Sequence, residues 1–359
     1  MTNVTLDADS VCNNATYEPY DDLSVSIMVY TAFPVMCFGW LANLLSARIW
    51  SNGQMRHSPI NWYLCVLSCS DFMILTTSFL FATLPRLGQV LRLYELIALS
   101  YLLTPYLFGL ALLSQTVSVY MTVLMSVHRY IGVCFPFRAH EILSRTRVRV
   151  AIGATLIFSV LFNFSRFFEV HILRLCHYTD IDASMPQLSP TALRMSPLYT
   201  LIFHGWLHTA IMFVVPFVTL IVVNSMVTKA IHRTAKLHRG MQGEDDATKR
   251  HELAKEISTS VMLVGVVLVF LSCNSLSFIL NIMENLGLDR TDTGPDPTFS
   301  ALVEINNLLI VINASINIFV YMLFSEKYRN LLQYYTGCYC CGCRDRAHAE
   351  LLLPAPSAV

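Results

Sequence analysis

The sequence predicts an all-α membrane protein, a seven-transmembrane helix bundle followed by a short amphipathic helix on the membrane surface. Of its 359 residues, 55% are hydrophobic and 13% are charged, whereas about 25% of the residues of an ordinary soluble protein are charged. Seven apolar runs are long enough to cross a bilayer as helices, which takes roughly 17–25 residues. A helix is the one open-chain element that satisfies its backbone hydrogen bonds in lipid. The formal net charge of zero gives no reason to expect nucleic acid as a partner.

Polar or charged turns separate the seven apolar runs. The runs lie near residues 25–50, 59–85, 97–131, 149–172, 199–231, 256–284 and 300–324. They form one transmembrane domain over residues 25–324, which follows an extracellular segment of residues 1–24. After it, we expect the amphipathic helix over residues 325–336 and a cytoplasmic tail over residues 337–359.

The basic residues indicate the direction in which the chain crosses the membrane. They gather in the loops after the first, third and fifth runs and in the tail, at Arg56, Arg138, Arg145, Arg147, Arg149, Lys229, Arg233, Lys236, Arg239, Lys249, Arg250, Lys255, Lys327 and Arg329. Acidic residues gather on the opposite side, at Asp7, Asp9, Glu18, Asp21, Asp22, Asp289, Asp292 and Asp296. Because basic loops stay in the cytoplasm, we expect the N-terminus outside the cell.

Several apolar runs carry polar side chains near their middle, where lipid surrounds a helix. These residues are Asn43, Asp71, Ser114, Ser118, Asn313 and Asn317. An ionised carboxylate without a partner is costly in such a place, so Asp71 should be protonated or coordinated. The alternative role for the whole set is hydrogen bonding between helices, which contributes about 0.6–2 kcal/mol per contact.

The third run ends in His128-Arg129-Tyr130, which puts a permanent charge at the edge of the membrane. Charged residues at such depths are usually retained for function. The motif resembles the Asp/Glu-Arg-Tyr region of rhodopsin-like (class A) G-protein-coupled receptors, with His128 in place of the acid. In those receptors the acid forms a salt bridge with the arginine that helps to hold the inactive state.

His128 cannot form that salt bridge. With an unperturbed pKa of about 6.5, histidine is largely neutral at cytosolic pH, and when protonated it would repel Arg129. This reading predicts that the usual restraint on the arginine is missing. The alternative is that Asp71, Asn317 or an inner-loop carboxylate such as Glu141 compensates for it.

Other motifs of the same receptors are present in altered form. The seventh run has Asn317-Ile318-Phe319-Val320-Tyr321 where most of these receptors have Asn-Pro-x-x-Tyr. The fifth run keeps Pro216 but has Asn224 where tyrosine is usual.

Four stretches together resemble invertebrate FMRFamide-type neuropeptide receptors. These stretches are Cys273-Asn274, the proline-free Asn317-x-x-x-Tyr321, Gln115-Thr116-Val117-Ser118-Val119-Tyr120, and Asn163-x-x-Arg166-Phe167-Phe168-Glu169.

The resemblance implies a receptor of the plasma membrane and not an enzyme. An extracellular neuropeptide, amidated and FMRFamide-like, would shift a two-state helix equilibrium and so activate a heterotrimeric G protein. Arrestin is a further implied partner. The residues implied in coupling and activation are His128, Arg129, Tyr130, Asn224, Asn317 and Tyr321.

The resemblance also implies an ion site and says something about the ligand. In rhodopsin-like receptors the positions that match Asp71 and its neighbours hold a sodium ion that favours the inactive state. Here that set comprises Asp71, Ser114, Ser118, Asn313 and Asn317. Amine receptors place an aspartate five helical turns before the arginine, but this chain has Ala111 there, so an ammonium ligand is not expected.

An Arg-Phe-amide peptide would require carboxylates for its guanidinium, hydrogen-bonding groups for its amide and aromatic walls. The candidate ligand-binding residues are Glu169, Glu284, Glu304, Gln115, Phe168, Tyr199 and Phe203. Two alternatives stay open for the glutamates. They are solvated residues at helix ends, or Arg86 and Arg166 neutralise them.

Cysteine usage departs from the receptor pattern. These receptors usually link the outer end of the third span to the second external loop. Cys176 supplies the loop partner, but no cysteine lies near Thr104, where the other is expected. We therefore predict a Cys12–Cys176 disulfide, formed in the oxidising lumen. The alternative is two free or intermolecular thiols.

The two ends of the chain carry candidate modification sites. Asn3 and Asn14 begin glycosylation sequons on the external segment. After the amphipathic helix, Cys338, Cys340, Cys341 and Cys343 suit palmitoylation at the membrane lipid, because their spacing is too tight for the usual zinc knuckle. Ser357-Ala358-Val359 fits capture by a PDZ protein through strand addition.

Two other classes of protein fit the sequence less well than a receptor does. His204-Gly205-Trp206-Leu207-His208 places two histidines on one helical face, as metal ligands often are, but offers no obvious third ligand. A transporter should have internal repeats and broken helices, and neither is visible in the sequence. Among receptors, the alternative is a chemosensory or small-molecule receptor of the same fold.

Overall fold

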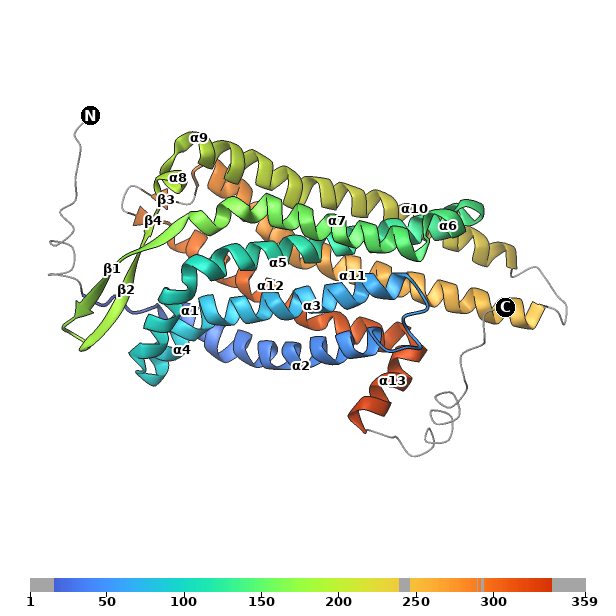
Figure 1. Ribbon diagram of the computed structural model, residues 1–359, viewed down its shortest axis with the longest axis horizontal. Coiled ribbons are helices and arrows are strands. Elements are labelled where there is room, and N and C mark those ends of the chain that lie inside the picture. The colour runs from blue at the N-terminus through green and yellow to red at the C-terminus, as the bar shows by residue number, and fades with distance from the viewer. Residues whose placement is uncertain (1–15, 239–245, 289, 292–293, 338–359) are drawn as a thin grey trace.

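The computed structural model describes residues 16–238, 246–288, 290–291 and 294–337, with side chains over 16–233, 257–288 and 296–337. The described chain is an elongated bundle of seven long helices, with a β-hairpin at one end and a short helix, α13, at the other (Figure 1). All seven are long and apolar enough to cross a membrane. The predicted seven-helix membrane fold is thereby confirmed.

Several spans are built from more than one helical segment. The first two are α1 (Asp22–Val25), η1 (Ser26–Ala32) and α2 (Phe33–Trp50), then α3 (Ile60–Ser78), η2 (Phe79–Thr83) and α4 (Leu84–Leu91). The third and fourth are α5 (Tyr94–Cys134), then α7 (Arg145–Asn163) with η3 (Phe164–Phe168). The others are α9 (Pro197–Tyr199), η4 (Thr200–Leu207), η5 (Ala210–Val214) and α10 (Val215–His238), then α11 (Asp246–Asn285) and α12 (Pro297–Phe324). The connecting elements are α6 (Pro136–Ile142), β1 (Val170–Tyr178), β2 (Ala183–Pro190), α8 (Ala192–Met195), β3 (Arg290–Thr291), β4 (Gly294–Pro295) and α13 (Glu326–Thr336).

The fourth span ends earlier than the apolar run suggested. We expected it to reach about residue 172, but the helix stops at Phe168 and the strand β1 begins at Val170. The apolar residues beyond that point belong to a hairpin in which β1 pairs antiparallel with β2. Cys176 lies on β1 opposite Met185, and both are buried.

The helix α5 crosses the centre of the bundle and contacts the second, fourth, fifth and sixth spans. Its buried face carries small hydroxyl side chains, which fit close helix contacts. Ser114, Thr116 and Thr122 each donate a hydrogen bond to a carbonyl one turn earlier in the same helix. Ser114 and Thr122 are therefore satisfied within α5, whereas Thr116 also accepts a hydrogen bond from the Asn163 amide of α7 (2.9 Å).

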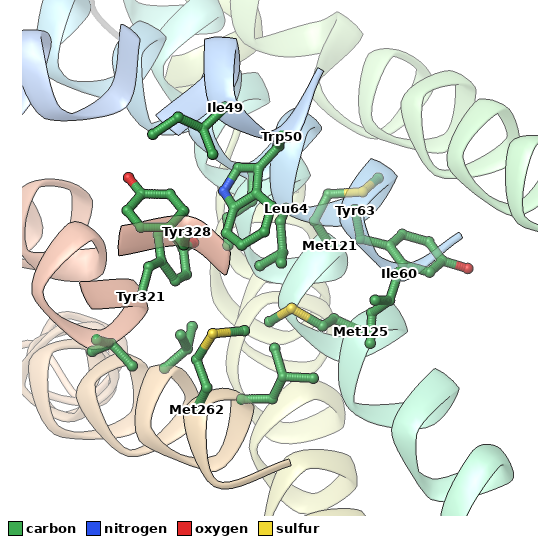
Figure 2. Close-up of a cluster of buried hydrophobic side chains, with 14 of the residues drawn as sticks. Ile49, Trp50, Ile60, Tyr63, Leu64, Met121, Met125, Met262, Tyr321 and Tyr328 are labelled. Atoms are coloured by element: carbon green, nitrogen blue, oxygen red, sulfur yellow. The ribbon is translucent and has the colours of Figure 1, made fainter. Parts of the chain in front are cut away.

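At the α13 end, a buried aromatic cluster joins the first and seventh spans to α13 (Figure 2). The Trp50 ring centroid lies 5.2 Å from that of Tyr321 and 5.0 Å from that of Tyr328. The hydroxyls of Ser46 and Tyr328 are 2.7 Å apart. Ser325 caps α13 by accepting a hydrogen bond from the Tyr328 amide (3.3 Å). The predicted amphipathic helix is thus present and docks on the bundle.

Candidate functional site

An apolar cavity of about 250 Å³ lies between the first, second, third and seventh spans, in the half of the bundle nearer the hairpin. Its walls are Met28, Met36, Ile74, Phe81, Ala82, Phe108, Ala111, Leu112, Ile310 and Val311. The polar lining groups are Thr77, Ser78, Gln115 and Asn307, and no charged side chain lines it. Gln115, a predicted ligand contact, therefore faces a neutral cavity.

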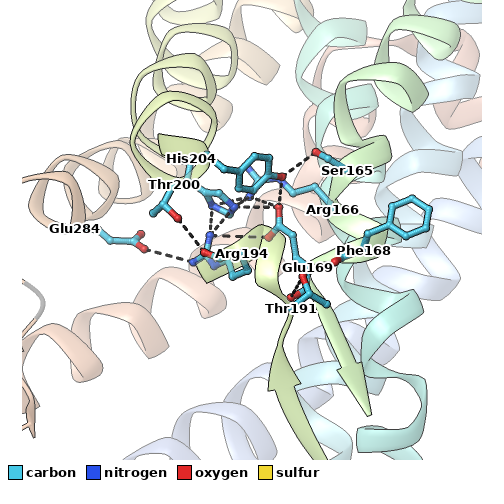
Figure 3. A network of polar contacts seen from close by, with 10 residues as sticks. Ser165, Arg166, Phe168, Glu169, Thr191, Arg194, Thr200, His204 and Glu284 are labelled. Carbon is cyan, nitrogen blue, oxygen red and sulfur yellow. Dashed lines mark hydrogen bonds and ion pairs between the residues drawn. The ribbon is translucent and has the colours of Figure 1, made fainter. Parts of the chain in front are cut away.

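A polar network occupies the opposite side of the hairpin end, between the fourth and fifth spans (Figure 3). Glu169 is its centre and is 0% exposed. Its Oε1 accepts a hydrogen bond from the Tyr199 hydroxyl (2.6 Å) and lies 3.0 Å from His204 Nε2 and 3.4 Å from Arg166 Nη1. The Arg166 guanidinium also lies 5.0 Å from the centre of the Phe203 ring.

These contacts decide the charge of Glu169. Burial alone would raise the pKa of this carboxyl. The hydrogen bonds from His204 and Tyr199 and the positive charge of Arg166 outweigh burial and hold its pKa below the ordinary value. Glu169 is therefore an anion at neutral pH.

Arg194, on α8, connects this network to the sixth span. Its Nη1 is 3.9 Å from Glu169 Oε2, and its Nη2 is 4.0 Å from Glu284 Oε1. The Glu284 side chain is 53% exposed and that of Arg194 is 31% exposed. Sequence reasoning missed Arg194, because nothing in its local sequence indicates a partner on another span.

Glu304, the third predicted carboxylate, is paired elsewhere. Arg86 Nη2 lies 2.5 Å from Glu304 Oε1, and the Ser24 hydroxyl donates to the same oxygen (2.9 Å). The Tyr20 ring covers the guanidinium, with its centroid 4.5 Å from Arg86 Cζ. Glu304 is therefore not simply a solvated residue at a helix end, because Arg86 neutralises it.

The predicted ligand residues therefore fall in separate places. Gln115 lines the apolar cavity, while Glu169, Tyr199 and Phe203 belong to the polar network. Phe168 lines a different crevice on the outside of the bundle, beside the hairpin.

Asp71 is 1% exposed and sits between the third and seventh spans. Its two oxygens accept hydrogen bonds from the Ser118 hydroxyl (2.8 Å) and the Asn317 amide (2.9 Å). Two other residues of the predicted sodium set make no hydrogen bond to Asp71 within the described residues. Ser114 donates to its own helix, and Asn313 makes no hydrogen bond within the described side chains.

At the α13 end, Arg129 lines a polar cavity of about 640 Å³. The cavity opens between the start of the second span, the sixth span, the end of the seventh span and α13. His128 packs its ring against Tyr63, with centroids 5.7 Å apart, and Tyr130 packs similarly against Phe135 at 5.5 Å.

The remaining residues implied in activation, and Glu141, are also placed. The buried Tyr321 hydroxyl has no hydrogen-bond partner within the described residues. The Asn224 amide donates to the carbonyl of Leu220 in its own helix (2.8 Å). Glu141 lies 3.5 Å from Arg147, on the exposed surface.

The two histidines weighed as metal ligands do not form a metal centre. His204 contacts Arg166 and Arg194, and His208 packs against the Phe213 ring, with centroids 5.8 Å apart. Within the described residues, no group of three or more His, Cys, Asp or Glu side chains could hold a metal ion.

Several predicted sites lie outside the described residues. They are Cys12, Asn3, Asn14, Cys338, Cys340, Cys341, Cys343 and the C-terminal residues 357–359. The Cys12–Cys176 disulfide, the glycosylation and the palmitoylation therefore stay predictions.

Comparison with known proteins places the chain in a family. The profile described as "7 transmembrane receptor (rhodopsin family)" matches residues 43–321. An FMRFamide receptor of Drosophila melanogaster is 30% identical over 301 residues, which cover 82% of this chain and 50% of that receptor. An FMRFamide peptide receptor of Caenorhabditis elegans is 29% identical over 325 residues, 89% of this chain and 71% of the relative.

A more distant relative is neuromedin-U receptor 2 of Rattus norvegicus, 23% identical over 334 residues, 90% of this chain and 78% of the relative. The chain spans about half the length of the Drosophila receptor and most of the length of the other two. It belongs to the rhodopsin family of seven-transmembrane receptors, which are not enzymes, and is related to receptors named for neuropeptides.

Proposed function

We propose that this receptor is activated by an extracellular neuropeptide that is amidated and FMRFamide-like, and that it then activates a heterotrimeric G protein. Two of its relatives are named for FMRFamide peptides and a third for neuromedin U. In this proposal the hairpin end faces outside the cell and the α13 end faces the cytoplasm. The basic residues of 138–149, of the end of α10 and of the start of α11 support this orientation, because these described parts of the chain lie at the α13 end (Figure 1).

The observation that carries the proposal is the neutral lining of the apolar cavity. A peptide that ends in a free carboxylate would bring an unpaired anion among apolar walls, which is costly. A carboxamide is neutral, and both of its halves can hydrogen-bond. The side-chain amides of Gln115 and Asn307 are available for this, since neither makes a hydrogen bond within the described side chains.

The test compares Phe-Met-Arg-Phe-amide with its free acid on cells that express the receptor, with G-protein activation as the readout. We expect the amide to activate and the acid to be at least about tenfold weaker, which corresponds to about 1.4 kcal/mol. Equal potency of the two peptides would contradict the role of the cavity. If neither peptide activates the receptor but a different amidated peptide does, the ligand is not FMRFamide-like.

A small neutral ligand is the second candidate. The apolar cavity, at about 250 Å³, is below the roughly 300–1,000 Å³ of sites for drug-sized molecules. It therefore holds one or two residues of a peptide or a small molecule. A response to small neutral compounds, with no response to any amidated peptide, would favour this chemosensory reading.

On the cytoplasmic side, we propose that the polar cavity and the loops around it dock the G protein, with arrestin as a second partner. Its central cation is Arg129, flanked by His128 and Tyr130. A ligand that binds the active form more tightly shifts the population toward it. Tyr321 and Asn224 would then repack around Arg129.

The cluster around Asp71 supports an ion site in part. Ser118 and Asn317 already contact the carboxylate, whereas Ser114 and Asn313 would have to turn toward it. We propose that sodium binds there and favours the inactive state. Replacement of sodium by a bulky organic cation should then raise agonist affinity.

We also propose the Cys12–Cys176 bridge. The Tyr17 amide donates to Asp180 at the tip of the hairpin (3.0 Å), so the described chain that follows Cys12 contacts the hairpin whose first strand carries Cys176. The Tyr17 hydroxyl donates to Gln89 of α4 (2.9 Å), which also ties Tyr17 to the second span. A peptide map under non-reducing conditions should yield a linked Cys12–Cys176 pair. Free alkylation of Cys12 would contradict it.

The other modifications concern the two ends of the chain. Glycosylation of Asn3 and Asn14 suits the outward orientation of the N-terminal segment. Palmitoylation of Cys338, Cys340, Cys341 and Cys343 suits cysteines that follow a docked membrane-surface helix. A PDZ protein remains the proposed partner of residues 357–359.

A further inference from the structure

Two carboxylates at the hairpin end face the same arginine. Arg194 lies between Glu169 and Glu284, 3.9 Å from an oxygen of the first and 4.0 Å from an oxygen of the second (Figure 3). Neither contact is a hydrogen bond, since charged N–H groups bond carboxylate oxygens at about 2.7–2.9 Å. Arg194 instead directs Nη1 at the ring of His204. Between this arginine and the two carboxylates there is attraction of charge without hydrogen bonding.

Glu169 is satisfied on one oxygen only. Its Oε1 receives all three close contacts, from Tyr199, His204 and Arg166. Its Oε2 is buried and accepts no hydrogen bond within the described residues. A buried carboxylate oxygen without a donor has lost its water and gained nothing in return. The structure therefore holds a vacant, buried, anionic acceptor beside Arg194.

Arg194 is placed so that it can move away. It lies on α8, a four-residue helix between β2 and the fifth span, and 31% of its side chain is exposed. Arg166, by contrast, is only 3% exposed and packs against the Phe203 ring. A long arginine side chain reaches water readily while its stem stays packed. Of the two arginines at Glu169, Arg194 is thus the exchangeable one.

We propose that the space between Glu169 Oε2 and Glu284 is a guanidinium-binding site, which Arg194 occupies in the absence of ligand and yields to the arginine side chain of the peptide. The inference rests on the proposed function and identifies which carboxylates take the ligand's cation. Glu304 Oε2 is likewise buried without a hydrogen bond within the described residues. Glu304 is excluded from this role because its cation is not exchangeable: Arg86 bonds Oε1 directly, is only 11% exposed and lies against the Tyr20 ring.

Charge balance requires an exchange. Glu169 and Glu284 are balanced by Arg166 and Arg194, so a further guanidinium would be repelled while Arg194 stays in place. Once Arg194 turns toward solvent, the incoming group finds two carboxylates and one remaining cation. It can donate to the vacant Oε2 and to the exposed Glu284. Ligand binding would thereby break the link between α8 and the sixth span that Arg194 provides.

The first test uses Arg194→Gln with two agonists, Phe-Met-Arg-Phe-amide and the same peptide with citrulline in place of arginine. Citrulline keeps the shape of the side chain and removes its charge. We expect the variant to lower the half-maximal concentration of the arginine peptide about fivefold, the scale of one partly exposed ion pair. The citrulline peptide should be unchanged. Arg194→Lys, which keeps the charge, and Arg92→Gln, an exposed arginine of another turn, should match the parent receptor.

The opposite pattern is equally informative. If Arg194→Gln weakens both peptides, Arg194 supports the loop or contacts the ligand, and the proposal is wrong. If both peptides gain equally, the effect is not one of charge, and the proposal is again wrong. Because Glu284 is 53% exposed, Glu284→Gln removes its charge without disturbing buried packing, and this second variant should weaken only the arginine peptide.

A second measurement separates this site from the identity of the agonist. Purified receptor is heated with Nα-acetyl-arginine amide or with Nα-acetyl-citrulline amide. We expect the arginine compound alone to raise the Tm, and to raise it more in Arg194→Gln. Equal Tm values with the two compounds in that variant would overturn the site. A selective rise in Tm, with no activation by the tetrapeptide, would keep the site and reject the FMRFamide-like ligand.

Discussion

The hairpin end of the receptor holds two acid–arginine clusters that differ in how tightly the arginine is held. In the Arg86–Glu304 pair the partners are 2.5 Å apart, almost buried, and covered by the Tyr20 ring. In the cluster of Glu169, Arg194 and Glu284, Arg194 lies 3.9 and 4.0 Å from the two carboxylates and is 31% exposed. Both Glu169 and Glu304 have a buried Oε2 without a hydrogen bond within the described residues, so the clusters differ in how the arginine is held. The first cluster fastens the first, second and seventh spans together. In the second, the arginine is exposed and not hydrogen-bonded to either carboxylate, and we propose that a ligand's guanidinium displaces it.

The largest expected difference concerns stability. Arg86→Ala leaves Glu304 buried without its cation, which should destabilise the receptor by about 3–5 kcal/mol. Arg194→Ala removes a partly exposed partner at a longer distance, and about 1 kcal/mol or less is expected. Thermal unfolding of the two purified variants, with surface expression as a second readout, measures the contrast. Equal losses would mean that the two clusters do not differ as described.

Substitutions in the two clusters should differ in how they affect the preference for an arginine peptide over its citrulline analogue. Glu284→Gln is expected to weaken the arginine tetrapeptide amide about tenfold and to leave its citrulline analogue unchanged, because it removes one charge-assisted contact. Glu304→Gln should change both peptides alike, since its partner is Arg86. Dose–response curves at matched surface expression decide between them. A selective loss in Glu304→Gln would reverse the assignment.

The α13 end offers a third case, in which the acid is absent altogether. His128 packs on Tyr63 beside Arg129 and supplies no negative charge. We expect His128→Asp to introduce an anion beside the arginine and to lower ligand-free signalling about twofold to fivefold, the scale of one weak ion pair. His128→Asn, which adds no charge, is the control. Unchanged or higher basal activity in His128→Asp would refute the reading.

The smallest effect is one of pH. The pKa of Glu169 in the folded receptor lies below its ordinary value of about 4.5, because hydrogen bonds from His204 and Tyr199 and the charge of Arg166 outweigh burial. Its stabilising contribution is therefore complete above that ordinary value and is lost as the pH falls through the lowered one. Between about pH 5 and 3 the Tm of the parent receptor should fall more steeply than that of Glu169→Gln. Parallel curves would show that this carboxylate does not contribute.

The fold was predictable because apolar runs report the spans directly. The third span was expected over 97–131 and is Tyr94–Cys134, and the surface helix was expected over 325–336 and is Glu326–Thr336. The errors are at the ends, where caps and turns decide. Beyond Phe168 the apolar residues alternate with polar ones, as in Val170-His171-Ile172, which is a strand pattern that hydropathy alone merges with the helix before it.

The candidate site was only partly predictable. The residues Asp71, Ser118 and Asn317 were chosen by their depth in the membrane, and the structure brings them into contact. The partners of the three glutamates could not be assigned in the same way. Glu304 and Arg86 are 218 residues apart in sequence, and no local spacing encodes which distant cation a carboxylate will meet. The role of Arg194 depends on distances of a few ångströms and on one unsatisfied oxygen.

The aromatic cluster of Trp50, Tyr321 and Tyr328 has a mechanical consequence. Only Ser325 separates α12 from α13, and the rings pack across that joint. The end of the seventh helix cannot rotate while α13 stays still unless these buried rings unpack. We therefore expect α12, which spans the membrane, and α13, on its surface, to move together as one rigid unit. A rotation of the seventh helix should therefore displace the far end of α13, and a fluorophore attached there would report that displacement.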